Sequence, residues 1–349
     1  MNSEERVLAA LAFNRPDRIP VFDSFWQYPP DWQARFGPAD ALTDVERFVP
    51  DETPFPSRAR LLKQEDGWIY EADSWGRTVR RRADAFFVET LDVALGPDAD
   101  IDAVQFESPV LDSRYCGSAT KAEFDRWLRG RTDTHYVFIK TGGPFLRTTF
   151  VRGETQFLID MAADPALARA IAGKVAGHIA AIGVEALRRT GLGANGVWIY
   201  DDMACNRGPF FSPRTFEQVL LPAYRRMIAA YRAAGARHVL LHSDGDVRPI
   251  LDMLIDAGID GLNPLERRAG MDILDMRRRY PRLVLTGGMD NTGTLIAGPI
   301  AAIESEARAI IDIGRDGGVI IGTHSISPEI PVEHFAAYRR VVEAYGVLS

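Results

Sequence analysis

The sequence predicts an α/β protein built as a (β/α)8 TIM barrel, with a hairpin-containing insertion in its N-terminal part. Short apolar runs recur along the chain, flanked by polar residues, as in strands buried on both faces of a parallel sheet. Segments with helical spacing separate these runs, which gives about eight strand-helix units. No linker-like or low-complexity segment interrupts them, so we expect one domain over residues 1–349.

One such unit shows the pattern most clearly. The apolar run 239–241 is followed by His242, Ser243, Asp244 and Gly245. Side chains alternate along a strand, so His242 and Asp244 are expected to leave it on the same side. Asp246 is placed to cap a helix that ends near Gly258. The polar residues therefore lie at the carboxyl end of a strand, where barrel enzymes keep their active sites.

The N-terminal part contains the first units and the insertion. Residues 2–13 read as an amphipathic helix capped by Asn2 or Ser3. Residues 18–23 are a candidate first strand, in which Pro20 is tolerated only at the start or edge, and a weaker strand is expected near residues 45–49. An insertion over about residues 52–130 is expected to cover the barrel mouth. Its hairpin has strands at 68–71 and 78–80, extended by residues 86–89.

From Tyr136 the alternation of strands and helices becomes regular. A long helical region is expected from about Gly153 to Arg189, and Ser212-Pro213 begins a further helix with an N-cap serine and a first-turn proline. The remaining strands are predicted at residues 137–140, 197–200, 239–241, 259–265, 283–285 and 319–322, and the last helix at 332–345.

Composition excludes several classes of protein. The formal charge of −7 argues against nucleic acid or an acidic membrane as the main partner. Cys116 and Cys205 lie far apart without CxxC spacing, so neither a disulfide framework nor a thiolate zinc site is suggested. The acidic N-terminus is unlike a signal peptide, and we expect a cytoplasmic protein.

A barrel brings the ends of all its strands to one rim, so polar residues distant in sequence become neighbours. Two histidines with carboxylates suit an open catalytic site for zinc or another divalent metal, and equally suit general acid-base chemistry without metal. The candidates at strand ends are Asp23, Asp201, Asp202, His242, Asp244, Glu266, Asp290 and His324.

Several of these residues also have structural explanations. Asp244 and Asp290 are natural helix-capping residues, and Glu266 can belong to an exposed ion-pair loop. Asp201 and Asp202 point opposite ways if both lie on the strand, so only one faces the rim; Asp201 is favoured. The aromatic residues Trp26, Tyr28, Trp198 and Tyr200 suit an apolar substrate pocket or core packing.

Several segments together resemble the uroporphyrinogen decarboxylase superfamily, which includes corrinoid-dependent methyltransferases. They are ERVLAALAFNRPDRIPV, DSWGR, GVWIYDD, LLHSDGDVRPILDMLIDAGIDGLNPLE, LVLTGGMD and GGVIIGTHSISPEIPVE. True decarboxylases carry an arginine-containing RQAGRY-like segment after the first strand, whereas Asp23 stands in that region here. His324 is similar to the histidine of the decarboxylase's GHGI segment, and Asp201 to the aspartate of its FDSW segment.

The DSWGR and HSDGD segments look more like the methyltransferase branch. Thiol-activating members hold zinc with a His-X-Cys pair and a later cysteine; here His242 matches the histidine, Asp244 replaces the first cysteine and His324 lies near the second. The resemblance implies metal-assisted methyl transfer from a small, O-methyl type substrate to a corrinoid. Combined with the positions of the residues at the strand ends, it predicts catalytic roles for Asp201, His242, Asp290 and His324. The residues named for the metal are His242, Asp244, Glu266 and His324, and those for the substrate are Asp23, Trp26, Tyr28, Tyr200 and Asp202.

The corrinoid is expected on a separate protein or free, because the chain shows no corrinoid-binding motif, and family members are often homodimers. Two alternatives stay open. One is a metal-free decarboxylase or lyase of a small carboxylic acid or porphyrinogen-like substrate, and the other is a non-catalytic ligand-binding barrel.

Overall fold

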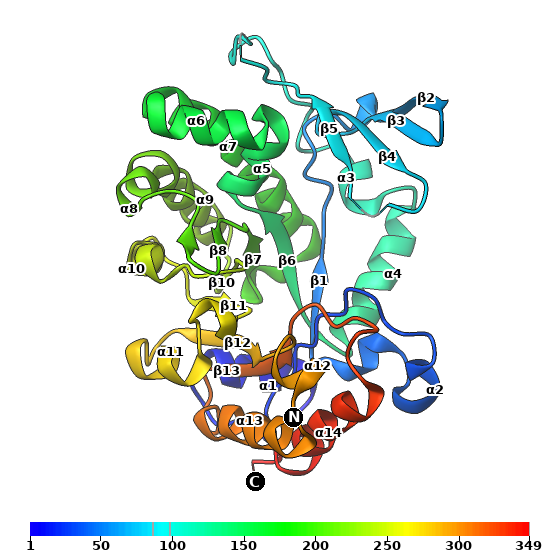
Figure 1. Ribbon diagram of the computed structural model, residues 1–349, viewed down its shortest axis with the longest axis vertical. Helices are drawn as coiled ribbons and strands as arrows, with labels where there is room; N and C mark the ends of the chain where they lie inside the picture. Colours follow the sequence, from blue (N-terminus) through cyan, green and yellow to red (C-terminus); the bar gives the residue numbers. More distant parts are fainter. Residues whose placement is uncertain (86, 98, 349) are drawn as a thin grey trace.

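A curled parallel sheet forms the centre of the molecule (Figure 1). The computed structural model describes residues 1–85, 87–97 and 99–348. In these residues the sheet has seven strands in the order β1-β6-β7-β10-β11-β12-β13, which confirms the parallel α/β architecture. Their bounds are β1 Val45–Phe48, β6 Tyr136–Gly142, β7 Val197–Tyr200, β10 Val239–His242, β11 Gly261–Asn263, β12 Val284–Met289 and β13 Val319–Thr323.

The inward-facing rows of the strands change from apolar to polar along their length. At the amino ends, large apolar side chains pack together inside the sheet, among them Phe138 and Trp198, whose ring centroids lie 5.4 Å apart. Two residues further along the same strands stand Lys140 and Tyr200. Because side chains alternate with a period of two, these polar residues lie on the same face as the apolar ones, one layer nearer the carboxyl ends.

The predicted first strand is not a regular strand, which corrects the expectation of eight complete strands. The segment around Val21 forms only isolated bridges, including Val21 with Ile321 and Phe25 with Ile326, so no continuous ladder closes the sheet between β13 and β1. On the β1 side, the Val21 N–H donates to the Asp44 side chain at 3.0 Å instead of to a backbone carbonyl. This side-chain bond replaces a bond that a closing ladder would use.

Helices cover the outside of the sheet (Figure 1), and two predictions about their ends hold. Asn2 caps the first helix in a capping box with Glu5, and Ser212 caps a helix that begins with Pro213. The helices are α1 Ser3–Leu11, α2 Trp32–Phe36, α3 Ser113–Cys116, α4 Lys121–Thr132, α5 Pro144–Arg152, α6 Glu154–Ala163, α7 Pro165–Thr190, α8 Pro213–Thr215, α9 Leu221–Ala233, α10 Arg248–Asp256, α11 Ile273–Arg279, α12 Thr294–Ala297, α13 Ile300–Ile313 and α14 Val332–Ala344.

The helical region predicted over about residues 153–189 is confirmed, and it is divided into two helices. The region consists of α6 and α7, and a separate α5 precedes them. Gly153 has a φ of 85° between α5 and α6, a conformation that suits glycine, and Asp164 caps α7 just before Pro165. Proline lacks an N–H and clashes with the preceding turn, so a continuous helix cannot pass through position 165.

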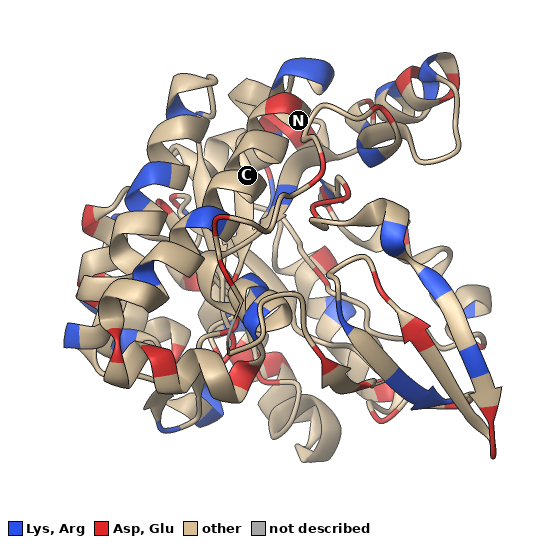
Figure 2. Cartoon of the chain, turned by 90° about the horizontal axis from the view of Figure 1, so that it is seen from above, with Lys and Arg blue, Asp and Glu red and all other residues tan. Residues whose placement is uncertain are grey.

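The insertion forms its own antiparallel sheet of β2 Arg60–Glu65, β3 Trp68–Ala72, β4 Thr78–Arg82 and β5 Glu89–Asp92. The predicted β3-β4 hairpin is confirmed; of its proposed extension, Phe86 lies outside the described residues and only Glu89 belongs to a strand. Seen from above, this sheet projects beside the barrel, and basic and acidic residues are interspersed along it (Figure 2).

One helix in the described part of the chain, α7, is long and apolar enough to span a membrane. Of its most apolar window, 61% is buried inside the protein. The helix packs against α9 and β6, so its apolar residues belong to the protein core.

Candidate metal site at the carboxyl ends of the strands

His242 ends β10 with its ring orientation fixed by a neighbouring amide. Its Nδ1 lies 2.5 Å from Asn263 Oδ1 at the end of β11, and Asn263 Nδ2 donates to the Thr286 carbonyl at 3.0 Å. A carbonyl only accepts, so the amide nitrogen must face Thr286 and its oxygen must face His242. The proton of His242 is therefore on Nδ1, and Nε2, which carries the lone pair, faces Asp202 and Asp244.

The structure brings His242, Asp244 and His324 together. One ligand atom from each lies within 4.8 Å of the other two. Asp244 Oδ1 is 3.6 Å from His242 Nε2 and 3.4 Å from His324 Nε2. This oxygen is buried and has no hydrogen-bond partner among the residues that the structure describes, although the Asp244 side chain as a whole is 40% exposed. A buried, unpartnered carboxylate oxygen between two imidazole nitrogens fits a divalent cation.

The pKa values of the three side chains follow from burial. Burial lowers the pKa of His242 well below its usual value, with a further contribution from His324, and it also lowers the pKa of His324. Both rings are neutral near pH 7, which is the form that binds metals. Burial, followed by the charges of Asp202 and Glu266, raises the pKa of Asp244 to about 7. A bound cation would reverse this cost by stabilising the carboxylate.

Two further predicted residues hold the loop after β10. Asp202 Oδ1 accepts the Asp244 N–H at 3.1 Å and lies 3.6 Å from His242 Nε2. Glu266 accepts the Gly245 N–H at 2.7 Å and pairs with Arg268 at 3.1 Å. Asp202 thus borders the metal group directly, whereas the hydrogen bonds of Glu266 place it in support of the loop.

Asp201 and Asp23 lie inside the protein. Asp201 is fully buried; its oxygens accept the N–H groups of Phe145 and Leu146 at the start of α5 and the hydroxyl of Tyr224. Burial raises the pKa of Asp201 to about 6. The Asp23 side chain has no exposed surface and accepts from Thr323, Tyr338 and Arg339. The structure does not bring either carboxylate into the group formed by His242, Asp244 and His324.

The other predicted residues occupy varied positions. Asp290 Oδ1 accepts the N–H groups of Thr292 and Gly293 at 3.0 Å, which is a turn-capping role. Trp26 is half-exposed, and the Tyr28 hydroxyl donates to the Gly37 carbonyl. Tyr200 stacks on His242 with ring centroids 4.3 Å apart.

Sequence reasoning missed three polar residues at this mouth, namely Asn263, Arg47 and Lys140. The sequence does indicate Lys140, because it is the charged residue directly after the apolar run Val137-Phe138-Ile139. It lies two residues after Phe138 and is therefore expected on the same face of the strand. Asn263 ends β11 as His242 ends β10, although the predicted strand extended over residues 259–265. The Asn263 carboxamide does not titrate, so a search for titratable side chains does not identify it.

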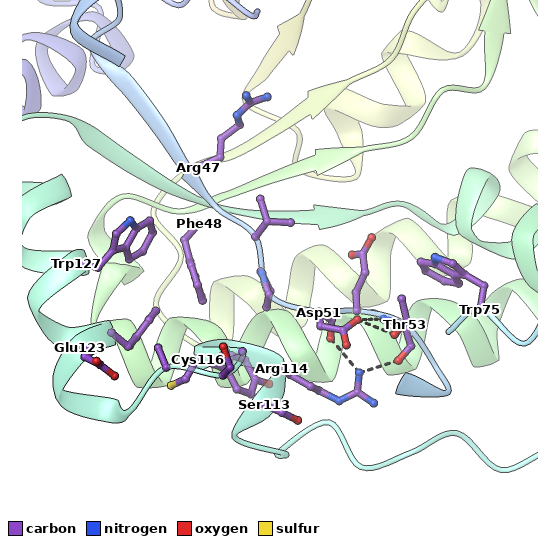
Figure 3. Close-up of a pocket in the computed structure, with 18 of the residues that line it drawn as sticks. Arg47, Phe48, Asp51, Thr53, Trp75, Ser113, Arg114, Cys116, Glu123 and Trp127 are labelled. Atoms are coloured by element: carbon purple, nitrogen blue, oxygen red, sulfur yellow. Dashed lines mark hydrogen bonds between the residues drawn. The ribbon is translucent and has the colours of Figure 1, made fainter. Parts of the chain in front are cut away.

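Two cavities are informative. One of about 420 Å³ borders Asp244 and Glu266, together with Cys205 and Arg268. A larger one of about 1050 Å³ lies between β1 and the insertion, where Phe48, Arg114 and Trp127 line it (Figure 3). Of His242, Asp244 and His324, only Asp244 lines the smaller cavity and none lines the larger one.

A family model named uroporphyrinogen decarboxylase (URO-D) matches residues 127–345, more than half of the chain. The chain therefore belongs to the URO-D family, and the resemblance to its methyltransferase-like branch is confirmed. It is 30% identical over 145 residues to methylcobamide:CoM methyltransferase MtaA from Methanosarcina barkeri; the match covers 42% of this chain and 40% of that relative. A methyltransferase from Methanosarcina mazei has the same fold, with a TM-score of 0.68, 18% identity and 99% coverage of both chains.

Proposed function

We propose that this protein is a metal-dependent methyltransferase that removes the methyl group of a small methylated substrate, with a corrinoid as acceptor. The observation that carries the metal is the unpartnered Asp244 Oδ1 between His242 and His324. The methyl transfer is supported by the similarity to MtaA, whose name specifies a methylcobamide and CoM. That similarity covers two fifths of the relative, so substrate and acceptor are proposals for this chain.

His242, Asp244 and His324 are the residues that would hold the cation. A His₂-carboxylate set with an open position supplies a Lewis acid, which suits polarisation of a methyl ether or phenolic oxygen. Asn263 keeps His242 in the tautomer that presents Nε2. Asp202 and Glu266 fix the loop that carries Asp244 by accepting its N–H and that of Gly245.

The roles of the remaining predicted residues are narrower. Tyr200 covers one face of His242 and forms part of the substrate wall. Asp201 and Asp290 act as positioning groups, because their oxygens are engaged by backbone N–H groups. Trp26 and Tyr28 remain proposed substrate contacts. The described side chains do not define a corrinoid site.

The proposal includes the organisation of the chain. We propose a single barrel domain over residues 1–349, in which the segment around Val21 completes the eighth strand position between β13 and β1, and the insertion at about 52–130 borders the mouth. A cytoplasmic location, a corrinoid protein as partner and a homodimer are part of the same proposal.

Elemental analysis tests the metal site directly. Protein purified without chelators or a histidine tag should contain about one equivalent of zinc, and His242→Ala and His324→Ala should each lose it. His238→Ala is the matched control, since His238 lies directly before the amino end of β10 and His242 lies at its carboxyl end. A metal-free wild type after zinc supplementation, with release of CO₂ from a small acid, would contradict the proposal and favour the decarboxylase alternative.

Methyl transfer itself is tested by incubating the zinc-loaded protein with cob(I)alamin and a panel of methyl ethers. Formation of methylcobalamin is monitored by absorbance and should require both His242 and His324. Unchanged turnover in a folded double variant of His242 and His324 would refute the mechanism.

A further inference from the structure

Two cationic side chains face the inside of the barrel mouth from β1 and β6. Arg47 shares the inward face of β1 with Val45, and Lys140 shares that of β6 with Phe138. In Figure 3 the Arg47 side chain extends to the opposite side of β1 from Phe48. Arg47 is among the residues that line the large outer cavity, and the end of its side chain reaches the Tyr200 hydroxyl on β7.

Neither cation has a carboxylate partner within 4.0 Å among the residues that the structure describes. Arg47 donates to the Tyr200 hydroxyl at 2.5 Å, and Lys140 Nζ lies 4.0 Å from the centre of the Tyr200 ring. The nearby Arg147 differs, because Glu52 pairs with it at 2.5 Å. The mouth therefore holds two positive charges without a close countercharge.

The electrostatics of Lys140 show the cost of this arrangement. Burial, followed by the charges of Arg47 and Arg147, lowers the pKa of Lys140 to about 8. Glu52 and Asp202 act in the opposite direction from beyond ion-pair distance, and their effect is the smaller one. Buried cations in proteins are normally paired, so this pair of side chains is suited to an anion from outside the chain.

Tyr200 separates the cations from the metal-binding residues. Strand β7 lies between β6 and β10, so Lys140 and His242 lie on opposite sides of Tyr200. The ammonium is 4.0 Å and the imidazole 4.3 Å from the Tyr200 ring centre, so they are no more than about 8 Å apart. A small molecule can span this distance, with an anionic group at one end near Lys140, since charge-assisted bonds measure about 2.8 Å.

We propose that Arg47 and Lys140 form an anion-binding subsite that holds a carboxylate or sulfonate of the methylated substrate beside His242, Asp244 and His324. The proposal rests on the proposed function, which supplies the methyl group. It specifies the substrate class as a small methylated acid, oriented with its negative charge on the β1-β6 side and its methyl-bearing atom on the β10-β13 side.

Direct binding of three probes tests this subsite without corrinoid or turnover. Methoxyacetate, 2-methoxyethanesulfonate and neutral methoxyacetamide are titrated calorimetrically into the full-length, zinc-supplemented protein. At least one of the two acids should bind about tenfold more tightly than the amide, since a charged hydrogen bond contributes about that factor. The acid that binds better identifies the anion. Equal affinities for the amide and both acids would overturn the proposal.

Variants assign the effect to the two side chains. Lys140→Met and Arg47→Met should each lose about tenfold in acid affinity and leave amide affinity unchanged, while Lys140→Arg should retain most of the preference. Lys121→Met is the control, because Lys121 lies exposed on α4. A folded Lys140→Met protein with wild-type preference would overturn the proposal, and Arg47→Met gives the same test if the first variant is unstable. Two outcomes separate this subsite from the proposed function. Variants that lose the acid preference but retain zinc show that the subsite acts independently of the metal site. A wild type that prefers the acids but transfers no methyl group supports the subsite and contradicts the proposed function.

Discussion

The two ends of the sheet contain carboxylates in opposite situations. At the amino end of β1, Asp44 is almost fully buried, and its two oxygens accept from Ser3, Arg6, Arg18 and the Val21 N–H. At the carboxyl end of β10, Asp244 Oδ1 is buried and accepts no hydrogen bond from the described part of the chain.

This difference teaches which charges serve the fold and which are available to a ligand. A carboxylate that is saturated by its own chain stabilises the native state and offers no free lone pair. An oxygen or ammonium that is buried without a partner costs stability, and such costs are concentrated at functional sites. In barrels the first situation is expected at the amino ends of the strands and the second at the carboxyl ends.

The largest expected effect is at Asp44. Asp44→Asn removes the countercharge of two arginines, of which Arg6 is nearly buried, so unfolding free energy should fall by about 3 kcal/mol. Urea denaturation measures this loss. Glu333→Gln is the control, since Glu333 pairs with Arg35 on the exposed surface, and its urea midpoint should not change. Equal midpoints in both variants would refute the assignment of Asp44 to the fold.

A smaller effect is expected from the amide that orients His242. Asn263→Ala removes the acceptor of His242 Nδ1–H, so zinc affinity should fall about 10- to 100-fold. Competition with a chromophoric chelator measures this affinity. Zinc affinity equal to that of the wild type, in a variant that remains folded, would show that Asn263 does not select the tautomer.

His178 provides a pH-dependent test of the rule that a buried polar group without a partner costs stability. Burial lowers its pKa to about 4, and its Nε2 has no hydrogen-bond partner within residues 1–85, 87–97 and 99–348. The folded pKa is below the unfolded value of about 6.5, so the unfolded chain binds the proton more readily. Stability should therefore be present above pH 6.5 and fall on acidification toward pH 4, by on the order of 1–3 kcal/mol from this residue. Urea unfolding of wild type and His178→Gln over this range should show a shallower slope for the variant; parallel curves would contradict the assignment.

The smallest effect on stability is expected at Asp244. Because Oδ1 has no partner, Asp244→Asn should leave the unfolding free energy of the metal-free protein unchanged or slightly higher. The same variant should lose zinc. The unfolding free energies of Asp244→Asn and Asp44→Asn are measured side by side. A destabilisation of Asp244→Asn similar to that of Asp44→Asn would show that Asp244 also stabilises the fold.

Much of the architecture could be predicted from the sequence. Strands β6, β7, β10 and β13 and the β3-β4 hairpin follow from apolar runs and their flanking residues, because local periodicity reports burial directly. His242 and His324 were found for the same reason, since His242 directly follows the apolar run 239–241 and His324 follows the run 319–321 after Gly322 and Thr323. Their assignment to a metal remains a prediction.

Other features depended on contacts that one sequence does not show. The Val21 N–H bonds to the side chain of Asp44, so the first strand lacks a regular ladder. Asp23 and Asp201 resembled His242 and Asp244 in sequence, as polar residues after apolar runs. Only the packing of Tyr224, Tyr338 and the start of α5 engages their oxygens.

The sequence by itself determined the alternation of strands and helices and the row of polar residues at the carboxyl ends, because both depend on near neighbours along the chain. The tertiary structure decided which polar atoms are satisfied. Among the described residues, Asp244 Oδ1 has no hydrogen-bond partner and Lys140 has no carboxylate within 4.0 Å, whereas Glu52 pairs with Arg147. Pairing between strands far apart in sequence sets that outcome, since each hydrogen bond depends on distances that only the folded chain defines.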